Sequence, residues 1–542
     1  MNELIGQIVG GSYTKGLILK LANTCNLEDL RVGEFVTIEG EKSKYFSLIT
    51  DIELETNNEK IFNYVALAKD EFIRDVLSGT TVFSKVKLNP YLMIDLKSNT
   101  QLETIPKIKT IPPHFSNVFK AKEEDIEQIF GKDEKLNTNF VIGTPCEMNT
   151  PVCINLEKFV QRSNAVFGKS GTGKSFLSRI LLSGILKKEV ASVLVFDMHN
   201  EYGWQGTSES TQEIKSVKGL KQLFNDKVEV FTLDPENKSY TFKDAQNLEI
   251  AWNQIDVEDL ELLRNEIGFS EASIDHIRML QRQYEKDWFS KVCNMTVGEL
   301  EEFSATHGAN IGSLFAIQRK LNSLVDSVTY LKSVVSFDGI KKILNFLVSG
   351  KSVVLQFGRL NNLKSYILAA NIITRQIHAA YVDLMEKYML DRTSFNKPNR
   401  LVICIEEAHK FLSPQASRSG TFGTIARELR KYNVTLLIID QRPSGIDDEV
   451  LSQIGTRATL LLNDERDINA VFVGESGSEE LKKILSNLNP TQEVLIFGYA
   501  MPMPIVIKSL RYDETFYKKI IQEEKLTKEE IIKRGELAAA EL

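Results

Sequence analysis

Short runs in which apolar and polar residues alternate fill residues 1–100, among them IGQIVGG, KGLILKL, GEFVTIEG and YFSLITDIEL. A period of two is typical of β-strands, because successive side chains point to opposite faces of a sheet. Gly, Asn, Asp and Lys residues separate the runs, as they do in the turns between short strands. The pattern predicts a small β domain at the amino end, either a barrel or a sandwich.

A different pattern follows, in which apolar strand-like runs alternate with segments of helical spacing over 151–240 and again over 346–505. This alternation predicts an α/β domain whose helices cover a parallel sheet. The intervening 241–345 is rich in Leu, Glu, Lys and Arg at helical spacing, and we expect it to be a helical insertion. Residues 101–150 hold three prolines in TIPKIKTIPPHFSNVF and are expected to be a linker, and 506–542 a charged helical brace.

One glycine-rich motif lies where VFGKSGTGKSFLSRIL follows a strand pattern and precedes a helix pattern. Its G-x-x-x-x-G-K-S spacing, which starts at Gly168, is that of a P-loop, in which backbone N–H groups surround a phosphate and the helix adds its positive end. Lys174 is expected to reach the β and γ phosphates of ATP, and the Ser175 hydroxyl to bind Mg²⁺. The other residues expected to contact the nucleotide here are Ser170, Gly171, Thr172, Gly173 and Phe176.

Two adjacent acids end the apolar run LVICIEEAH in the second α/β segment. A P-loop site needs a carboxylate on an adjacent strand, and Glu406 suits coordination of Mg²⁺ and its water ligands. Glu407 suits polarising the water that attacks the phosphate. The alternative is an exposed acidic pair after a buried strand, but a P-loop in the same chain favours the catalytic interpretation. Two acids together indicate hydrolysis of the nucleotide and not binding alone.

Polar residues follow two further strand patterns. VLVFDMHNEY ends with Asp197 and Glu201, which either form a plain turn or lie at the nucleotide site, because ligands of parallel sheets bind at the carboxyl edge. In IARELRKYNVTLLIIDQRPS, Gln441 stands at the tip of a strand and is placed to sense the γ phosphate. Arg427 and Arg430 precede that strand on a helix, where they are either solvated or reach the γ phosphate of a neighbouring subunit.

The composition narrows the class of protein. With 42% hydrophobic and 26% charged residues, the chain is typical of globular proteins. No apolar run reaches the ~18 residues that span a bilayer, and the start MNELIGQIVGG lacks the pattern of a signal peptide. The five cysteines form no CxxC pair, which disfavours a zinc site or disulfides and favours the cytoplasm. The net charge of −7 disfavours a protein that coats nucleic acid over its whole surface, but is compatible with a narrow basic channel.

The order of the motifs resembles that of the HerA family of hexameric DNA translocases, which are related to FtsK. The P-loop, DMHNEY, IEEAH, RELRKY and IIDQRPS stand in the family's order, and IIDQRPS followed by VLSQIGTRATLLL is the most specific part. The resemblance covers nearly the whole chain. It implies a RecA-like P-loop ATPase core behind an N-terminal β-barrel, a homohexameric ring with ATP between subunits, and double-stranded DNA in the central channel. The family often has Gly at the position of Asn200 and Asp at that of Glu406, and both acids bind Mg²⁺.

The resemblance also implies roles for three arginines and for a partner. Arg430 would act as the finger on a neighbouring subunit's ATP, with Arg427 as the competing choice, and Arg162 would contact phosphate as well. The usual partner in the family is a NurA-like nuclease for DNA end resection, and related proteins are paired with sirtuin-like or nuclease effectors in antiphage defence. We expect such an effector at the barrel. Arg359 and Lys364 are candidates for contact with DNA. The alternative function is a nucleotide-gated ring scaffold that regulates an effector with little translocation.

Overall fold

The computed structural model describes residues 3–22, 24–56, 82–96, 108–207, 216–234, 236, 245–360, 362–428, 431–475 and 477–521. These residues form two compact units, one from 3–155 and 456–510 and the other from 156–455 and 511–521. Within the described ranges, no helix has both the length and the apolar character needed to cross a membrane.

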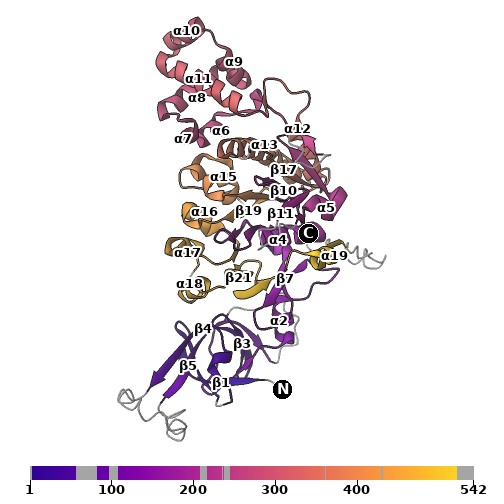
Figure 1. Ribbon diagram of the computed structural model, residues 1–542, viewed down its shortest axis with the longest axis vertical. Helices are drawn as coiled ribbons and strands as arrows, with labels where there is room; N and C mark the ends of the chain where they lie inside the picture. The colour runs from indigo at the N-terminus through magenta and orange to yellow at the C-terminus, as the bar shows by residue number, and fades with distance from the viewer. Residues whose placement is uncertain are drawn as a thin grey trace. The chain divides into compact units, whose positions relative to one another are not determined.

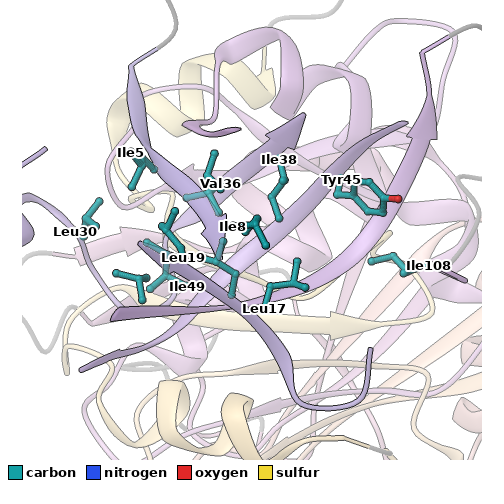
Figure 2. Packing of buried hydrophobic residues seen from close by; sticks show 13 residues of the cluster. Ile5, Ile8, Leu17, Leu19, Leu30, Val36, Ile38, Tyr45, Ile49 and Ile108 are labelled. Carbon is teal, nitrogen blue, oxygen red and sulfur yellow. The ribbon is translucent and has the colours of Figure 1, made fainter. Parts of the chain in front are cut away.

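A closed barrel of six strands forms the amino end of the first unit (Figure 1), in the order β1-β2-β5-β4-β3-β6. Its strands are β1 (Leu4–Ser12), β2 (Gly16–Leu21), β3 (Phe35–Glu39), β4 (Ser43–Thr56), β5 (Val82–Asp95) and β6 (Asn117–Lys120). All neighbouring strands are antiparallel. The apolar residues of the alternating runs turn inward, where Ile5, Leu19, Val36 and Ile49 belong to one buried core (Figure 2). Of the two predicted β architectures, the barrel is confirmed.

Residues 101–150 are more than the linker that their prolines predicted. Strand β6 lies in this segment and pairs with both β1 and β3, so that it closes the barrel. Four residues give too short a run for a periodic signal, and the nearby prolines point to a loop instead. Helix α2 (Glu123–Phe130) and strand β7 (Asn139–Pro145) complete the segment.

The rest of the first unit contains a second set of strands, in the order β20-β21-β22-β7-β8 with antiparallel neighbours. Its other elements are β8 (Val152–Asn155), β20 (Thr456–Thr459), α17 (Glu465–Val471), α18 (Glu479–Ser486), β21 (Glu493–Gly498) and β22 (Ile505–Ser509). Residues 456–505, expected in the ATPase core, fall in the first unit, where β21 pairs with β22 and β22 pairs with β7.

The second unit is built on parallel strands in the order β14-β13-β17-β10-β18-β19-β9. The strands are β9 (Asn164–Phe167), β10 (Ser192–Asp197), β13 (Val228–Thr232), β14 (Gln246–Asn247), β17 (Ser352–Gln356), β18 (Leu401–Glu406) and β19 (Val434–Asp440). Strands β10, β17, β18 and β19 are buried along their whole length, which accounts for their continuous apolar runs. The predicted α/β class is confirmed.

Helices cover this sheet, with α4 against β9 and β10, α12 against β17 and β10, and α15 against β19. The remaining elements of the core are α3 (Leu156–Val160), α4 (Lys174–Lys188), β11 (Gln205–Thr207), β12 (Ser216–Lys218), α5 (Leu220–Phe224), α12 (Gly339–Val348), α13 (Leu363–Leu390), α14 (Ala416–Ser419), α15 (Thr421–Glu428), α16 (Asp448–Gln453) and α19 (Glu514–Ile521). Because the strands are parallel, the residues that follow β9, β10, β17, β18 and β19 gather at one edge.

The segment expected to be a helical insertion consists mainly of helices, which lie together beyond α13 in Figure 1. They are α6 (Val257–Leu262), α7 (Arg264–Ile267), α8 (Glu271–Tyr284), α9 (Trp288–Asn294), α10 (Val297–His307) and α11 (Ile311–Ser327), with the short strands β15 (Ile250–Ala251) and β16 (Leu331–Lys332). The buried Asp259 of α6 binds Arg375 and Asn371 of α13 at 2.7 and 2.6 Å, which ties the insertion to the core. Of the expected C-terminal brace, α19 is helical, and 522–542 lie outside the described residues.

Candidate functional site

The glycine-rich loop joins the buried strand β9 to helix α4, as the sequence predicted. Gly171 and Gly173 have φ values of 77° and 102°, a backbone region that residues with a side chain rarely enter. A Cβ atom on Gly171 would meet nothing within 4 Å, so the loop surface is open above it. Lys174 begins α4 and its Nζ donates to the Lys169 carbonyl oxygen at 3.1 Å, which holds the ammonium group over the loop. The loop therefore presents N–H groups and a cation to one anion.

Of the two candidate acids, Glu406 ends β18 and Glu407 follows it. This strand does not pair with β9, because β19 lies between them. The expectation of an adjacent strand is corrected to one strand further along the sheet. Glu406 is 7% exposed, and the Tyr202 hydroxyl donates to its Oε1 at 3.1 Å. Burial, together with the nearby Asp197 and Glu201 carboxylates, raises the pKa of Glu406 to about 8.

Glu407 has a different environment and points toward β19. Its backbone adopts a left-handed conformation with φ of 50°, and its side chain is 32% exposed. Gln441 Nε2 donates to Glu407 Oε1 at 3.4 Å, so the structure brings together two residues that the sequence placed on separate strands. The Gln441 amide orients a carboxylate that is open to solvent, which is the arrangement needed to accept a proton from water.

Asp440 and His409 support this pair and were not singled out from the sequence. The buried Asp440 carboxylate accepts from the N–H groups of His409 and Arg442 at 2.7 and 2.6 Å, and lies 3.0 Å from His409 Nδ1. The Asp440 carbonyl oxygen accepts from the N–H of Gly168 at 3.2 Å. Asp440 thus links the end of β18 to the start of the P-loop. An acid at the end of an apolar run, as in IIDQ, is the signal that could have found it.

Asp197 folds the loop that follows β10. Its carboxylate accepts three backbone N–H groups, from Glu201, Tyr202 and Gly203 at 2.7 to 3.1 Å, and burial raises its pKa to about 6. These three bonds are those of the plain-turn alternative, and a role of Asp197 at the nucleotide stays a prediction.

Glu201 pairs with Arg179, a residue of α4 that the sequence analysis did not select. Arg179 is 1% exposed and binds Glu201 at 3.0 Å. Its guanidinium lies 5.3 to 5.7 Å from the ring centroids of Phe176, Tyr202 and Tyr512. The ring of Phe176, expected at the nucleotide, thus also packs on this cation. A lone arginine in the apolar stretch FLSRILL is the sequence signal for this cluster.

The arginines predicted to act on phosphate occupy three different settings. Arg430 lies outside the described residues. Arg427, at the end of α15, donates to the Ser417 carbonyl oxygen at 2.8 Å. Arg162 precedes β9 with its side chain against Gly455, and the length of β9, roughly 13 Å, separates it from the P-loop. This separation argues against contact between Arg162 and the P-loop phosphate site of its own chain.

The candidate DNA-contacting residues follow β17. Arg359 is 63% exposed, and its Nε and Nη2 donate to Asp234 at 2.9 and 3.0 Å. This pairing raises the pKa of Arg359 and lowers that of Asp234. Lys364 stands in the first turn of α13.

The residues present fit a nucleotide-bound Mg²⁺. Glu406 Oε2 is buried and, among the described residues, has no hydrogen-bond partner, as expected for an oxygen reserved for a cation. In the same part of the chain, no cluster of three or more His, Cys, Asp or Glu residues could hold a metal alone. Ser175 and Glu406 would therefore supply few ligands and the phosphates the others, which is the usual mode of Mg²⁺ binding.

Comparison with known proteins finds similar chains among helicases. Residues 140–377 match the family model described as the central domain of helicase HerA. The DNA double-strand break repair helicase HerA of Sulfurisphaera tokodaii is 24% identical over 536 residues, which cover 97% of this chain and 98% of that protein. The protein of the same name from Saccharolobus solfataricus is 23% identical over 93% of this chain and 92% of its own length. Among solved structures, VirB4 of Thermoanaerobacter pseudethanolicus aligns at 15% identity with a TM-score of 0.44, over 70% of this chain and 98% of that chain. The chain is a P-loop ATPase whose residues 140–377 are similar to the central domain of helicase HerA, and it is similar to the two relatives along nearly their whole length.

Proposed function

We propose that this ATPase is a translocase on double-stranded DNA that works as a homohexameric ring with a nuclease or another effector. One observation supports the proposal: the glycine-rich loop follows β9, Gln441 follows β19 and Glu407 follows β18, and these three parallel strands are neighbours in the sheet. The curated relatives that match nearly the whole chain are named DNA double-strand break repair helicases.

Each residue of the site has a role in ATP hydrolysis under this proposal. Lys174 and the loop N–H groups bind the β and γ phosphates, and Ser175 with Glu406 holds Mg²⁺. When bound, Mg²⁺ neutralises charge on the phosphate oxygens. Glu407 accepts a proton from the attacking water, and Gln441 keeps the Glu407 carboxylate oriented. The position of Gln441 also allows it to change with the presence of the γ phosphate.

In the proposed ring, arginines of one subunit act on the ATP of its neighbour. Arg430, or Arg427 in its place, extends to the ATP of a neighbouring subunit, where an arginine stabilises the charge that develops on the transferred phosphoryl group. Arg162 is a second candidate for the neighbour, because the length of β9 separates it from its own P-loop. We place double-stranded DNA in the channel, with Arg359 and Lys364 near its phosphates, and the effector on the barrel, either in DNA end processing or in antiphage defence.

A nucleotide-gated scaffold is the second candidate, and the net charge of −7 favours it because a DNA-binding surface is usually basic. In this alternative, ATP binding assembles the ring and regulates the effector, while turnover is slow. Glu407→Gln separates the two, because a motor loses effector stimulation when hydrolysis stops and a scaffold keeps it.

The first experiment is ATP hydrolysis with and without linear duplex DNA, alone and with the protein encoded by the neighbouring gene. Stimulation by DNA supports the translocase, whereas turnover that ignores DNA and responds only to the neighbour supports the scaffold. The double variant Arg359→Ala, Lys364→Ala should reduce the stimulation of ATP turnover by DNA. Lys387→Ala, Arg392→Ala, which removes two exposed cations near the other end of α13, is the matched control.

A further inference from the structure

The loop 198–203, between β10 and β11, is bound at one point to the loop that follows β17. Asn200 Nδ2 donates to the Gly358 carbonyl oxygen at 3.1 Å, and the Gly358 N–H donates to Asn200 Oδ1 at 2.9 Å. Both residues have left-handed backbones, with φ of 58° and 59°. This reciprocal pair needs the Asn200 side-chain amide, since glycine, which suits the same backbone conformation, can form neither bond.

A second point of the same loop is bound to the metal-binding acid. The Tyr202 ring is fully buried, and its hydroxyl donates to Glu406 Oε1 at 3.1 Å. The N–H groups of Glu201, Tyr202 and Gly203 all donate to Asp197, and these bonds fix the shape of the turn that contains Asn200 and Tyr202. Glu406 has one oxygen on Tyr202 and the other free for a cation among the described residues, and Tyr202 therefore sets where that second oxygen points.

The loop that follows β17 is in turn held by hydrogen bonds to Asp234. Next to Gly358, the Arg359 N–H, Nε and Nη2 all donate to the carboxylate of Asp234, which follows β13. A Cβ atom on Gly358 would lie 2.6 Å from Asp234 Cβ, so the Gly358 backbone packs closely against Asp234. Arg359 nevertheless leaves 63% of its side chain exposed to a ligand.

We propose that the loop 198–203 couples the Arg359 loop to Glu406, with Asn200 and Tyr202 as positioning residues that act through Gly358 and Glu406. This inference rests on the proposed function in one respect, because DNA is the ligand expected at Arg359. A ligand that draws Arg359 away from Asp234 displaces Gly358, then Asn200, and through Tyr202 it changes the orientation of the Mg²⁺-binding oxygen. ATP turnover then responds to DNA without any contact between DNA and the nucleotide.

The test compares Asn200→Gly, Tyr202→Phe and the double variant with His199→Ala, which changes an exposed residue of the same loop. For each, ATP turnover is measured with and without linear duplex DNA and against Mg²⁺ concentration, and the thermal midpoint reports folding. Asn200→Gly should keep basal turnover at saturating Mg²⁺ and lower the stimulation by DNA about threefold to tenfold, the equivalent of one or two hydrogen bonds. Tyr202→Phe should raise the half-saturating Mg²⁺ concentration by a similar factor.

The double variant distinguishes coupling from simple loss of structure. If both residues act on one path, Asn200→Gly has little further effect in the Tyr202→Phe background, whereas independent structural effects multiply. The inference would be overturned if the effects of the two substitutions multiply in the double variant. It would also be overturned if Asn200→Gly has the same stimulation by DNA and the same Mg²⁺ dependence as His199→Ala. If DNA does not stimulate the unmodified protein, the proposed function fails instead. The inference is then tested without DNA, by measuring the half-saturating Mg²⁺ concentration of Asn200→Gly with Tyr202 present and in the Tyr202→Phe background. An increase only when Tyr202 is present supports the inference, and an equal increase in both backgrounds contradicts it.

Discussion

Replacement of Glu407 by glutamine should stop ATP hydrolysis while leaving the fold and nucleotide binding in place. Glutamine has the size of glutamate, and its amide oxygen can still accept the hydrogen bond that Gln441 Nε2 donates at 3.4 Å. The side chain is 32% exposed and lies outside the core, so the change in the free energy of unfolding should stay within about 0.5 kcal/mol. What disappears is the ability to take up a proton.

The size of the effect follows from the role of a general base. Such a group contributes about 10²- to 10⁴-fold to the rate. We therefore expect kcat for ATP to fall by about this factor. The affinity for a fluorescent ATP analogue should not change, because the proposed function assigns the phosphates to the loop after β9 and to Lys174. Steady-state hydrolysis and equilibrium binding on the same preparation measure the two quantities.

A matched control is Glu449→Gln, which removes the same charge from an exposed position in the first turn of α16. Its kcat should equal that of the unmodified protein. Loss of less than tenfold in kcat for Glu407→Gln would refute the assignment of Glu407 as the base. An equal loss of nucleotide affinity would also refute it, because the residue would then act in binding.

Three other results are expected. Lys174→Ala should weaken ATP binding about tenfold to a hundredfold in a titration, because a charge-assisted bond to phosphate is removed, whereas Lys169→Ala in the same loop should bind normally. Asp259→Ala should lower the free energy of unfolding by about 3–5 kcal/mol, because it leaves a half-buried guanidinium unpaired, and urea denaturation followed by tryptophan fluorescence would show the loss. Asp275→Ala, which breaks an exposed ion pair on α8, should change stability by less than about 1 kcal/mol, and equal losses in the two aspartate variants would contradict the argument. Chelation with EDTA should abolish turnover, and added Mg²⁺ should restore it; activity that persists in EDTA would exclude Mg²⁺ as the cofactor.

The sequence alone was sufficient to predict the elements that are specified by consecutive residues. The P-loop could be predicted because its glycines, lysine and serine are consecutive, and because the flanking apolar runs specify a strand and a helix. The long buried strands β10, β18 and β19 could be predicted because a parallel sheet covered on both faces requires continuous apolar runs. The two acids at the carboxyl end of β18 could be selected because the carboxyl ends of such strands meet at the edge of the sheet where ligands bind.

Tertiary structure decided the features that depend on pairing between distant segments. The four residues of β6 show no clear strand pattern in the sequence, and they form a strand because they pair with β1 on one side and β3 on the other. The sequence of a single strand does not determine its neighbours in the sheet. The tertiary structure places β19 between β9 and β18, and this places Asp440 at the site. Asp197 likewise accepts hydrogen bonds from its own loop. Asn200 forms its hydrogen bond with Gly358, which is 158 residues away in the sequence. A residue type limits which bonds a side chain can form, but its partner is chosen by the packing of the whole chain.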